Sequence, residues 1–313
     1  MTHVLALLGV LSISFSAVFV RLAGVSPVTA TFYRAAYAVP VLAILWACSR
    51  GEDTRSTNAR LLAFGSGIIL AMDLAFWHES IALIGAGLAT VIANVQVVFV
   101  ALAAWALYGE RPSRKTAAIV VVVLAGMTLT SGLARQDAYG SNPVLGAVFG
   151  ACAGFCYAGF LMAFRAASQS VAAVSGPLCD STLGTVVGAL LCAPLDPHFS
   201  LAAPMNAQLW LATLALVSQV MGWLLIASAL TRLPAIETSV LLLVQPVFAV
   251  VWGMLIFSER LSGLQWIGSL LVLGGVGALG QASQVERRFA ELLVQLDGQA
   301  VQLLRAAAEH AVD

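Results

Sequence analysis

Two stretches of the chain, QVVFVALAAWALYGER at 96–111 and QPVFAVVWGMLIFSER at 245–260, share the pattern Gln-x13-Glu-Arg. They align without a gap at an offset of 149 residues. Apolar matches at one offset arise easily by chance, but a glutamine, a glutamate and an arginine at fixed spacing do not. The pattern therefore predicts an internal repeat. The same offset superposes other pairs outside the two stretches: Met72 on Met221, Ala86 on Ala235, Val91 on Val240, Leu124 on Leu273 and Gly126 on Gly275.

The apolar character of these stretches extends through the chain of 313 residues, which is 60% hydrophobic and 10% charged. Soluble globular proteins carry about 25% charged residues, so this composition indicates an integral membrane protein and excludes soluble enzymes. Fifteen basic and 15 acidic residues give no net charge. The sequence has no basic patch of the kind that binds nucleic acid, so we do not expect a nucleic-acid partner. The five cysteines show no CxxC spacing and predict neither a metal site nor a disulfide framework. We expect no cofactor.

Helices of about 20 apolar residues span a bilayer, and charged or Pro/Gly-rich breaks divide this chain into ten such segments. Each half holds five, an odd number, so the second half must cross the membrane in the opposite sense. The sequence predicts an all-α membrane protein of two inverted five-helix repeats, residues 1–133 and 134–281, a plan typical of secondary transporters. The predicted spans are 2–22, 27–48, 59–79, 86–107, 115–132, 143–165, 171–193, 207–229, 235–257 and 262–281.

Basic residues predict the orientation, because cytoplasmic loops retain Lys and Arg. We expect the protein to lie in the cytoplasmic membrane with both termini in the cytoplasm. This orientation places eleven basic residues inside and three outside. The tail, 282–313, repeats apolar residues at spacings of three and four with charges between them. This spacing predicts a cytoplasmic amphipathic helix that lies on the membrane or pairs with a partner helix. The run Gly146, Gly150 and Gly154 predicts a close approach between two helices.

The ten-span plan, the Gln-x13-Glu-Arg pattern closing the fourth and ninth spans, and the glycine-rich fifth and tenth spans resemble the EamA-type family of the drug/metabolite transporter superfamily. The resemblance covers residues 2–281. It implies that helices 1–4 and 6–9 surround a central cavity, that helices 5 and 10 lie outside it, and that the protein exports small metabolites. Many members have Trp-Gly in the first helix, where this chain has Ile13-Ser14.

Ionisable side chains inside a bilayer are costly and need a partner or a wet cavity. Arg34 in the second predicted span, Asp73 in the third and Asn94 in the fourth all lie about 10 to 12 Å from the outer face. We therefore expect Arg34 and Asp73 to be in contact. The pair either staples two helices together or opens to receive a zwitterion, with Arg34 taking a carboxylate, Asp73 an ammonium group and Asn94 acting as a neutral partner.

Two further acids differ in their surroundings. Asp180 is nine residues into the predicted seventh span, near the midplane, with no basic residue at its depth in the sequence. Desolvation favours the protonated form of such a carboxyl group, which makes Asp180 a candidate for proton coupling. The alternative is a neutral Asp180 hydrogen-bonded to Ser181, Thr182 or a neighbouring helix. Glu237 falls in the first turn of the ninth span, where an acid complements the helix dipole.

Aromatic and amide side chains complete the candidate substrate site. Tyr37 lies near Arg34, Trp77 lies one turn above Asp73, and Trp223 lies in the eighth span on the same face as Gln219. These aromatic residues either line a pocket or pack between helices. Gln245 is placed at a helix contact or the cavity edge together with its repeat partner, Gln96. Because Gln96 and Asn94 are about 200° apart on a regular helix, we expect that only one of them faces the cavity.

The sequence therefore predicts a secondary transporter that exports an amino acid, a related zwitterion or an organic cation by alternating access around a central cavity. Its partners are a small-molecule substrate and the lipid bilayer, with proton coupling as a hypothesis and a homodimer left open. No P-loop, HExxH or GxSxG motif occurs, so the protein is not expected to be an enzyme. The alternative is a non-transporting membrane component that assembles with partners through its tail helix.

Overall fold

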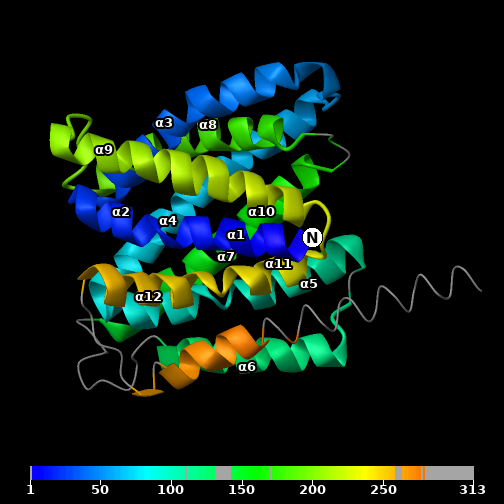
Figure 1. The fold of residues 1–313 in the computed structure, drawn as a ribbon, viewed down its shortest axis with the longest axis vertical. Helices are drawn as coiled ribbons and strands as arrows, with labels where there is room; N and C mark the ends of the chain where they lie inside the picture. Colours follow the sequence, from blue (N-terminus) through cyan, green and yellow to red (C-terminus); the bar gives the residue numbers. More distant parts are fainter. Residues whose placement is uncertain are drawn as a thin grey trace, which may run out of the picture.

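The structure is a computed structural model that describes residues 2–109, 111–130, 142–169, 171, 173–257, 263–264, 266–275 and 278. The described residues form helices and no strands, and the helices run mostly along one direction in a single bundle (Figure 1). The tail predicted as an amphipathic helix lies outside the described residues. The helices are α1 (Thr2–Ser14), α2 (Ser16–Ala23), α3 (Pro27–Cys48), η1 (Arg50–Glu52), α4 (Thr57–Ala93), α5 (Gln96–Tyr108), α6 (Arg114–Thr130), α7 (Pro143–Ala167), α8 (Ser175–Cys192), η2 (Ala193–Leu195), α9 (Met205–Thr213), η3 (Leu214–Gly222), α10 (Trp223–Leu230), α11 (Ala235–Leu242) and α12 (Gln245–Phe257).

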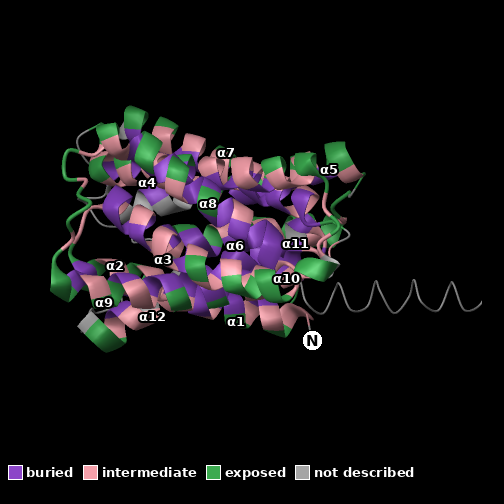
Figure 2. Ribbon diagram, turned by 90° about the horizontal axis from the view of Figure 1, so that it is seen from above, coloured by how far each residue is buried: buried purple, intermediate pink, exposed green. Residues whose placement is uncertain are grey.

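Seven helical stretches are long and apolar enough to cross a membrane, and two shorter apolar helices accompany them. The protein is therefore a multi-pass membrane protein. Exposed residues lie mostly on the outer surface of the bundle and buried residues mostly on the helix faces turned inward (Figure 2). The seven stretches are Thr2–Ala23, Pro27–Cys48, Thr57–Ile84, Val144–Ala167, Ser175–Leu195, Met205–Leu230 and Glu237–Ile256, and the shorter helices are Gln96–Tyr108 and Trp266–Gly275.

The two ends of the bundle carry different loops, and each end is called here by one of its residues. The Arg55 face holds the start of α1 and the loop 49–56, and the Asp196 face holds the loops 24–26 and 193–204. In Figure 1 the Arg55 face lies on the right, beside the N-terminus, and the Asp196 face lies on the left. Helix α3 therefore runs from the Asp196 face to the Arg55 face, and α8 runs the opposite way.

Helix α4 reverses direction although its helical hydrogen bonding continues for 37 residues. A straight helix of that length would measure about 55 Å, far more than the bilayer core of about 30 Å. A Cβ atom at Gly150 of α7 would lie 3.1 Å from Ser80 Oγ and 3.0 Å from Ile92, whereas Gly146, one turn earlier on α7, meets Ile84. The chain thus advances along α7 to Ile84 and has returned by Ile92. This reversal lies at the break predicted between 79 and 86.

Glycines allow α7 to lie directly against α4. A Cβ atom on Gly154 would stand 2.6 Å from the carbonyl oxygen of Ala93, and one on Gly146 would stand 2.3 Å from the Ile84 side chain. Real Cβ atoms do not approach other atoms this closely, so larger residues would separate the two helices. The close approach predicted for the Gly146, Gly150 and Gly154 run is confirmed.

Helix breaks recur at the repeat offset. Helix α4 ends at Ala93 and α5 begins at Gln96, while α11 ends at Leu242 and α12 begins at Gln245. Both breaks thus consist of two residues and lie 149 positions apart. The far ends of α5 and α12 obey the same offset.

Candidate functional site

A cavity of about 430 Å³ lies among α1, α2, α3, α4, α7 and α10, and reaches the breaks before α5 and α12. It extends from residues near the Asp196 face, such as Pro27 and Ile81, to the middle of the bundle. Six of the seven predicted substrate-binding residues line it: Arg34, Asp73, Trp77, Asn94, Trp223 and Gln245. The structure therefore brings together side chains from four helices, α3, α4, α10 and α12, and from the break before α5.

Arg34 reaches the cavity from the first third of α3. Its Nε donates a hydrogen bond of 3.1 Å to Oε1 of Gln219, and Gln219 in turn donates to Thr182 of α8 at 3.2 Å. Gln219 lies in η3, a π-helical segment, and π-helical turns occur frequently at functional sites. The half-buried guanidinium of Arg34 is thus held by a neutral partner, and this contact does not compensate its positive charge.

Asp73 does not form the predicted ion pair with Arg34. No N–O distance between them is within 4.0 Å, although both residues line the same cavity. Tyr157 of α7 lines the same cavity as both residues. Asp73 itself is 8% exposed. The two residues line one cavity without an ion pair between them, so they do not join α3 to α4 as predicted.

Asn94 and Gln96 both line the cavity, and the expectation that only one of them could do so is wrong. That expectation assumed a regular helix through both residues. The structure instead breaks the helix at Asn94 and Val95, with a tight hydrogen bond of 3.1 Å from the Val95 amide to the Ile92 carbonyl oxygen. The changed rotation per residue turns both amides towards the same space.

Trp223 forms part of the cavity floor. It is 3% exposed and packs edge-on against Phe160 with the ring centroids 4.9 Å apart. Phe160 continues the contact to Phe164, and both rings are fully buried. Aromatic packing of this kind excludes water. The bundle is therefore filled between the cavity and the Arg55 face.

Tyr37 was predicted to bind substrate, but it does not line the cavity. Its hydroxyl group contacts Oε1 of Gln208 in α9, and the neighbouring Tyr33 donates to the Leu201 carbonyl oxygen at 2.6 Å. Both tyrosines therefore turn from α3 towards α9 and the loop before it. Tyr37 is three residues from Arg34, so the two side chains are about 60° apart around the helix, with Tyr37 on the side that meets α9.

Asp180 is not the lone carboxylate that the sequence suggested. The guanidinium of Arg55 lies 2.9 Å from Asp180 Oδ2. Helix α8 begins at Ser175, so Asp180 is six residues into the helix and closer to the Arg55 face than predicted. The loop 49–56 folds over the start of α8 and brings Arg55 to it, a contact that the distance along the chain did not reveal.

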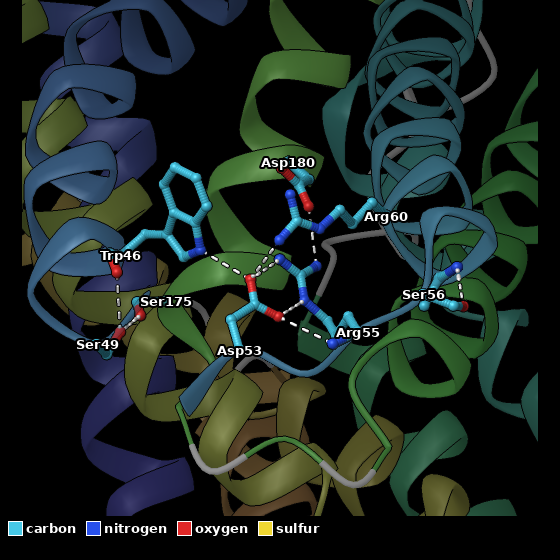
Figure 3. A network of polar contacts seen from close by, with 9 residues as sticks. Trp46, Ser49, Asp53, Arg55, Ser56, Arg60, Ser175 and Asp180 are labelled. Carbon is cyan, nitrogen blue, oxygen red and sulfur yellow. Dashed lines mark hydrogen bonds and ion pairs between the residues drawn. The ribbon is translucent and has the colours of Figure 1, made fainter. Parts of the chain in front are cut away.

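A polar cluster surrounds this ion pair and is here called the Arg55 latch (Figure 3). Asp53 accepts from Arg55 at 2.8 and 3.0 Å, from Arg60 at 3.3 Å and from the Trp46 indole at 2.7 Å. The Arg55 guanidinium holds the pKa of Asp53 well below its usual value. The latch joins α3, the loop, α4 and α8.

A second contact closes the Arg55 face between the start of α1 and α11. Nε2 of His3 lies 3.2 Å from Oε2 of Glu237. Glu237 occupies the first turn of α11, as predicted for an acid that complements the helix dipole. The His3 contact was not predicted, because the two residues are 234 positions apart.

Three residues that line the cavity were not part of the substrate site predicted from the sequence. Tyr157 is aromatic in an apolar span and carries no signal of its own, and Gln96 was assigned to the cavity edge. His78 also lines the cavity, and its Nδ1 is buried without a hydrogen-bond partner in the described structure.

These features define a helical membrane protein with a charged internal cavity. The chain belongs to the EamA-like transporter family, whose model matches residues 1–132 and 144–280. The family suggested by the Gln-x13-Glu-Arg pattern is thereby confirmed. The two matched segments divide the chain near the boundary predicted between the repeats.

Individual relatives are distant. The uncharacterized transporter YwfM of Bacillus subtilis (strain 168) is 24% identical over 239 residues, which is 72% of this chain and 75% of that protein. A probable 4-amino-4-deoxy-L-arabinose-phosphoundecaprenol flippase subunit, ArnE of Pseudomonas fluorescens (strain Pf0-1), is 40% identical over 75 residues, 24% of this chain and 63% of that one. A solved crystal structure superposes with a TM-score of 0.75 over 92% of this chain and 98% of the other, at 19% identity, and this likeness concerns the fold alone.

Proposed function

We propose that this transporter exports a small zwitterionic metabolite, an amino acid or a related compound, through the cytoplasmic membrane by alternating access. The observation that carries the proposal is that Arg34 and Asp73 line one cavity without pairing to each other. Two separated opposite charges match the carboxylate and the ammonium group of a zwitterion. A volume of about 430 Å³ is in the range of pockets for small molecules.

The proposal includes ten spans in two inverted repeats with both termini in the cytoplasm. Helix occupies most of each of the ten predicted segments in the described structure. Two ion-pair contacts join segment ends that this topology places on the cytoplasmic side. They are the contact of Arg55 with Asp180 and the contact of His3 with Glu237. The Val28 amide, which donates to Asp196 at 3.3 Å, joins two ends placed outside. These contacts support the proposed threading of the chain.

In this topology the Arg55 face is cytoplasmic, and the cavity lies in the outer half of the bundle. The bundle would then be in an outward-facing state. Access from the cytoplasm would require the Arg55 latch to release α8 and the Phe160 layer to part. Asp180 accordingly serves the latch in this proposal, and Asp73, which faces the cavity, takes over the role of candidate proton or ammonium acceptor.

The proposed function is tested by counterflow of labelled amino acids and amines in proteoliposomes. We expect Asp73→Asn and Arg34→Gln each to lower the flux about tenfold or more, because each removes a hydrogen bond to a charged group. Since the two charges do not pair, each single variant leaves the other with its present neighbours and should fold normally. Tyr37→Phe is the matched control, because it lies on the same helix outside the cavity and should retain the parental flux.

Two outcomes contradict the proposal. If the parent protein gives no flux with any compound of the panel under any gradient, the alternative of a non-transporting assembly component is favoured. If the parent transports but both charge variants transport equally well, the substrate site lies elsewhere. Expression and gel filtration of each variant separate loss of transport from loss of folding.

A further inference from the structure

The two helix breaks at the cavity leave backbone groups without their regular partners. At the first break, the amides of Val95 and Val98 bond three residues back, to Ile92 and Val95 respectively, at 3.1 and 2.8 Å. At the second, the amides of Leu243 and Val244 bond three residues back at 3.0 and 3.1 Å. Such tight turns depart from the α-helical pattern, in which each carbonyl oxygen accepts from the amide four residues on.

The second break contains a proline directly after Gln245. Pro246 has no N–H group, so the carbonyl oxygen of Leu242 cannot receive the hydrogen bond that the residue four positions on supplies in an α-helix. Leu242 lines the cavity. The Leu242 carbonyl oxygen therefore lacks its α-helical donor at the cavity edge.

Gln96 supplies a second acceptor from the first break. It is 2% exposed and lines the cavity, and its Oε1 has no hydrogen-bond partner among the residues that the structure describes. The amide orientation follows from the other end, because Nε2 lies 3.5 Å from the carbonyl oxygen of Ser239, and only the nitrogen can donate to that oxygen. A buried, unpaired acceptor is unfavourable unless a ligand completes it.

Asp73 and Gln96 line the same cavity, and Tyr157 of α7 lines it with them. The main chain at Gln96 lies close to α7, because a Cβ atom on Gly154 would stand 3.3 Å from the Gln96 backbone nitrogen. The carboxyl group of Asp73 and the amide of Gln96 thus belong to the lining of one space beside α7. Both are acceptors, and both belong to the first half of the chain.

The geometry points to an ammonium subsite at the helix breaks, formed by Asp73, Gln96 Oε1 and the Leu242 carbonyl oxygen, that recognises a primary amine through its N–H groups. A primary ammonium carries three donors, which matches three acceptors. A quaternary ammonium carries the same charge but has no N–H group, so Gln96 and Leu242 would remain unpaired beside it. The inference rests on the proposed function, because it assigns one end of the same substrate.

The test compares n-butylammonium with n-butyltrimethylammonium as probes, measured by the shift in melting temperature of the purified protein in detergent. We expect the primary amine to raise the melting temperature and the trimethyl form to require at least about a tenfold higher concentration for the same rise. Gln96→Met, which keeps the length and removes the acceptor, should abolish most of this discrimination. Gln96→Glu keeps an acceptor and should retain it. Gln208→Met is the control, since Gln208 contacts Tyr37 outside the cavity.

Equal responses to both probes, or no response to either, would overturn the subsite. Unchanged discrimination in Gln96→Met would remove Gln96 from it. If Gln96→Met fails to fold, the Gln96→Glu variant still decides, because loss of discrimination in that variant contradicts an acceptor role. The proposed function fails separately, when parental flux is absent or insensitive to Asp73→Asn. A transporter that needs Asp73 but accepts both probes equally would keep the function and refute the subsite.

Discussion

Gly67→Ala is expected to separate α4 from α8 and to lower the yield of folded protein severalfold. A Cβ atom at Gly67 would stand 1.7 Å from the carbonyl oxygen of Ser181, and one at Gly184 on the facing helix would stand 1.9 Å from the Phe64 carbonyl oxygen. Main-chain atoms cannot rotate away as a flexible side chain can, so the helices must move. Overpacking costs about 1 to 3 kcal/mol or more, and this clash lies at the severe end. The measurement is the melting temperature together with the monodisperse fraction on gel filtration.

Gly65→Ala is the matched control for this experiment. Gly65 lies in the same helix two residues earlier, and a Cβ atom there meets nothing within 4 Å. Because alanine has the higher helix propensity, by about 1 kcal/mol, this variant should be as stable as the parent or slightly more so. Equal melting temperatures for Gly67→Ala and Gly65→Ala would show that α4 and α8 do not pack as described.

Asp53→Ala is expected to release the loop 49–56 from α8 and to expose Cys179, which is 5% exposed beside Asp180 in the intact protein. Asp53 is the shared acceptor of Arg55, Arg60 and Trp46, and removing one member of a buried pair costs about 3 to 5 kcal/mol. Because Arg55 keeps its contact with Asp180, the loss of stability should lie at the lower end of this range. The rate at which a maleimide modifies Cys179 should rise at least about tenfold.

Asp196→Ala is the control for the latch, because Asp196 contacts Val28 at the opposite face and should leave the modification of Cys179 unchanged. A reaction rate at Cys179 that is the same in Asp53→Ala and the parent would mean that the latch does not close this face. The four other cysteines, Cys48, Cys152, Cys156 and Cys192, are replaced by alanine throughout, so that the maleimide reports on Cys179 alone.

The latch should persist through the physiological pH range. Arg55 lowers the pKa of Asp53 in the folded protein, so the stability that this ion pair contributes is fully present above the ordinary aspartate value of about 3.9. It is lost only as the pH falls through the lowered pKa of the folded state. Protection of Cys179 after brief exposure to buffers between pH 5 and pH 8, about the range in which histidines titrate, should therefore be constant, when reaction is measured at one common pH.

Hydropathy located the helices because a bilayer sets both their length and their composition. Helix α3 covers the predicted residues 27–48 without a shift, and α7 and α8 begin or end within a few residues of their predictions. The internal irregularities were not visible in this way. The breaks after Ala93 and Leu242 and the π-helical η3 do not change the mean hydropathy, although Pro246 marks one of them in the sequence.

The sequence predicted which polar residues approach one another, but it did not predict their directions around each helix. Arg34 and Asp73 line one cavity, although they form no ion pair. Their separation depends on rotations of α3 and α4 that the positions of single polar residues cannot fix. The prediction that Tyr37 binds substrate was wrong for the same reason. The Asp180 prediction failed differently, because a short polar loop returned Arg55 to the helix bundle.

The nine-residue segment η3 (Leu214–Gly222) has a consequence for how the cavity can change between relatives. A π-helical turn holds one residue more than an α-helical turn, so one deletion near Met221 would restore a regular helix. The side chains before the deletion, Gln219 among them, would then rotate by about 100° relative to those after it. Gln219 would turn relative to Trp223 and would face Arg34 from a different angle. One codon thus separates two registers of the same helix, with a different neighbour for the Arg34 guanidinium in each.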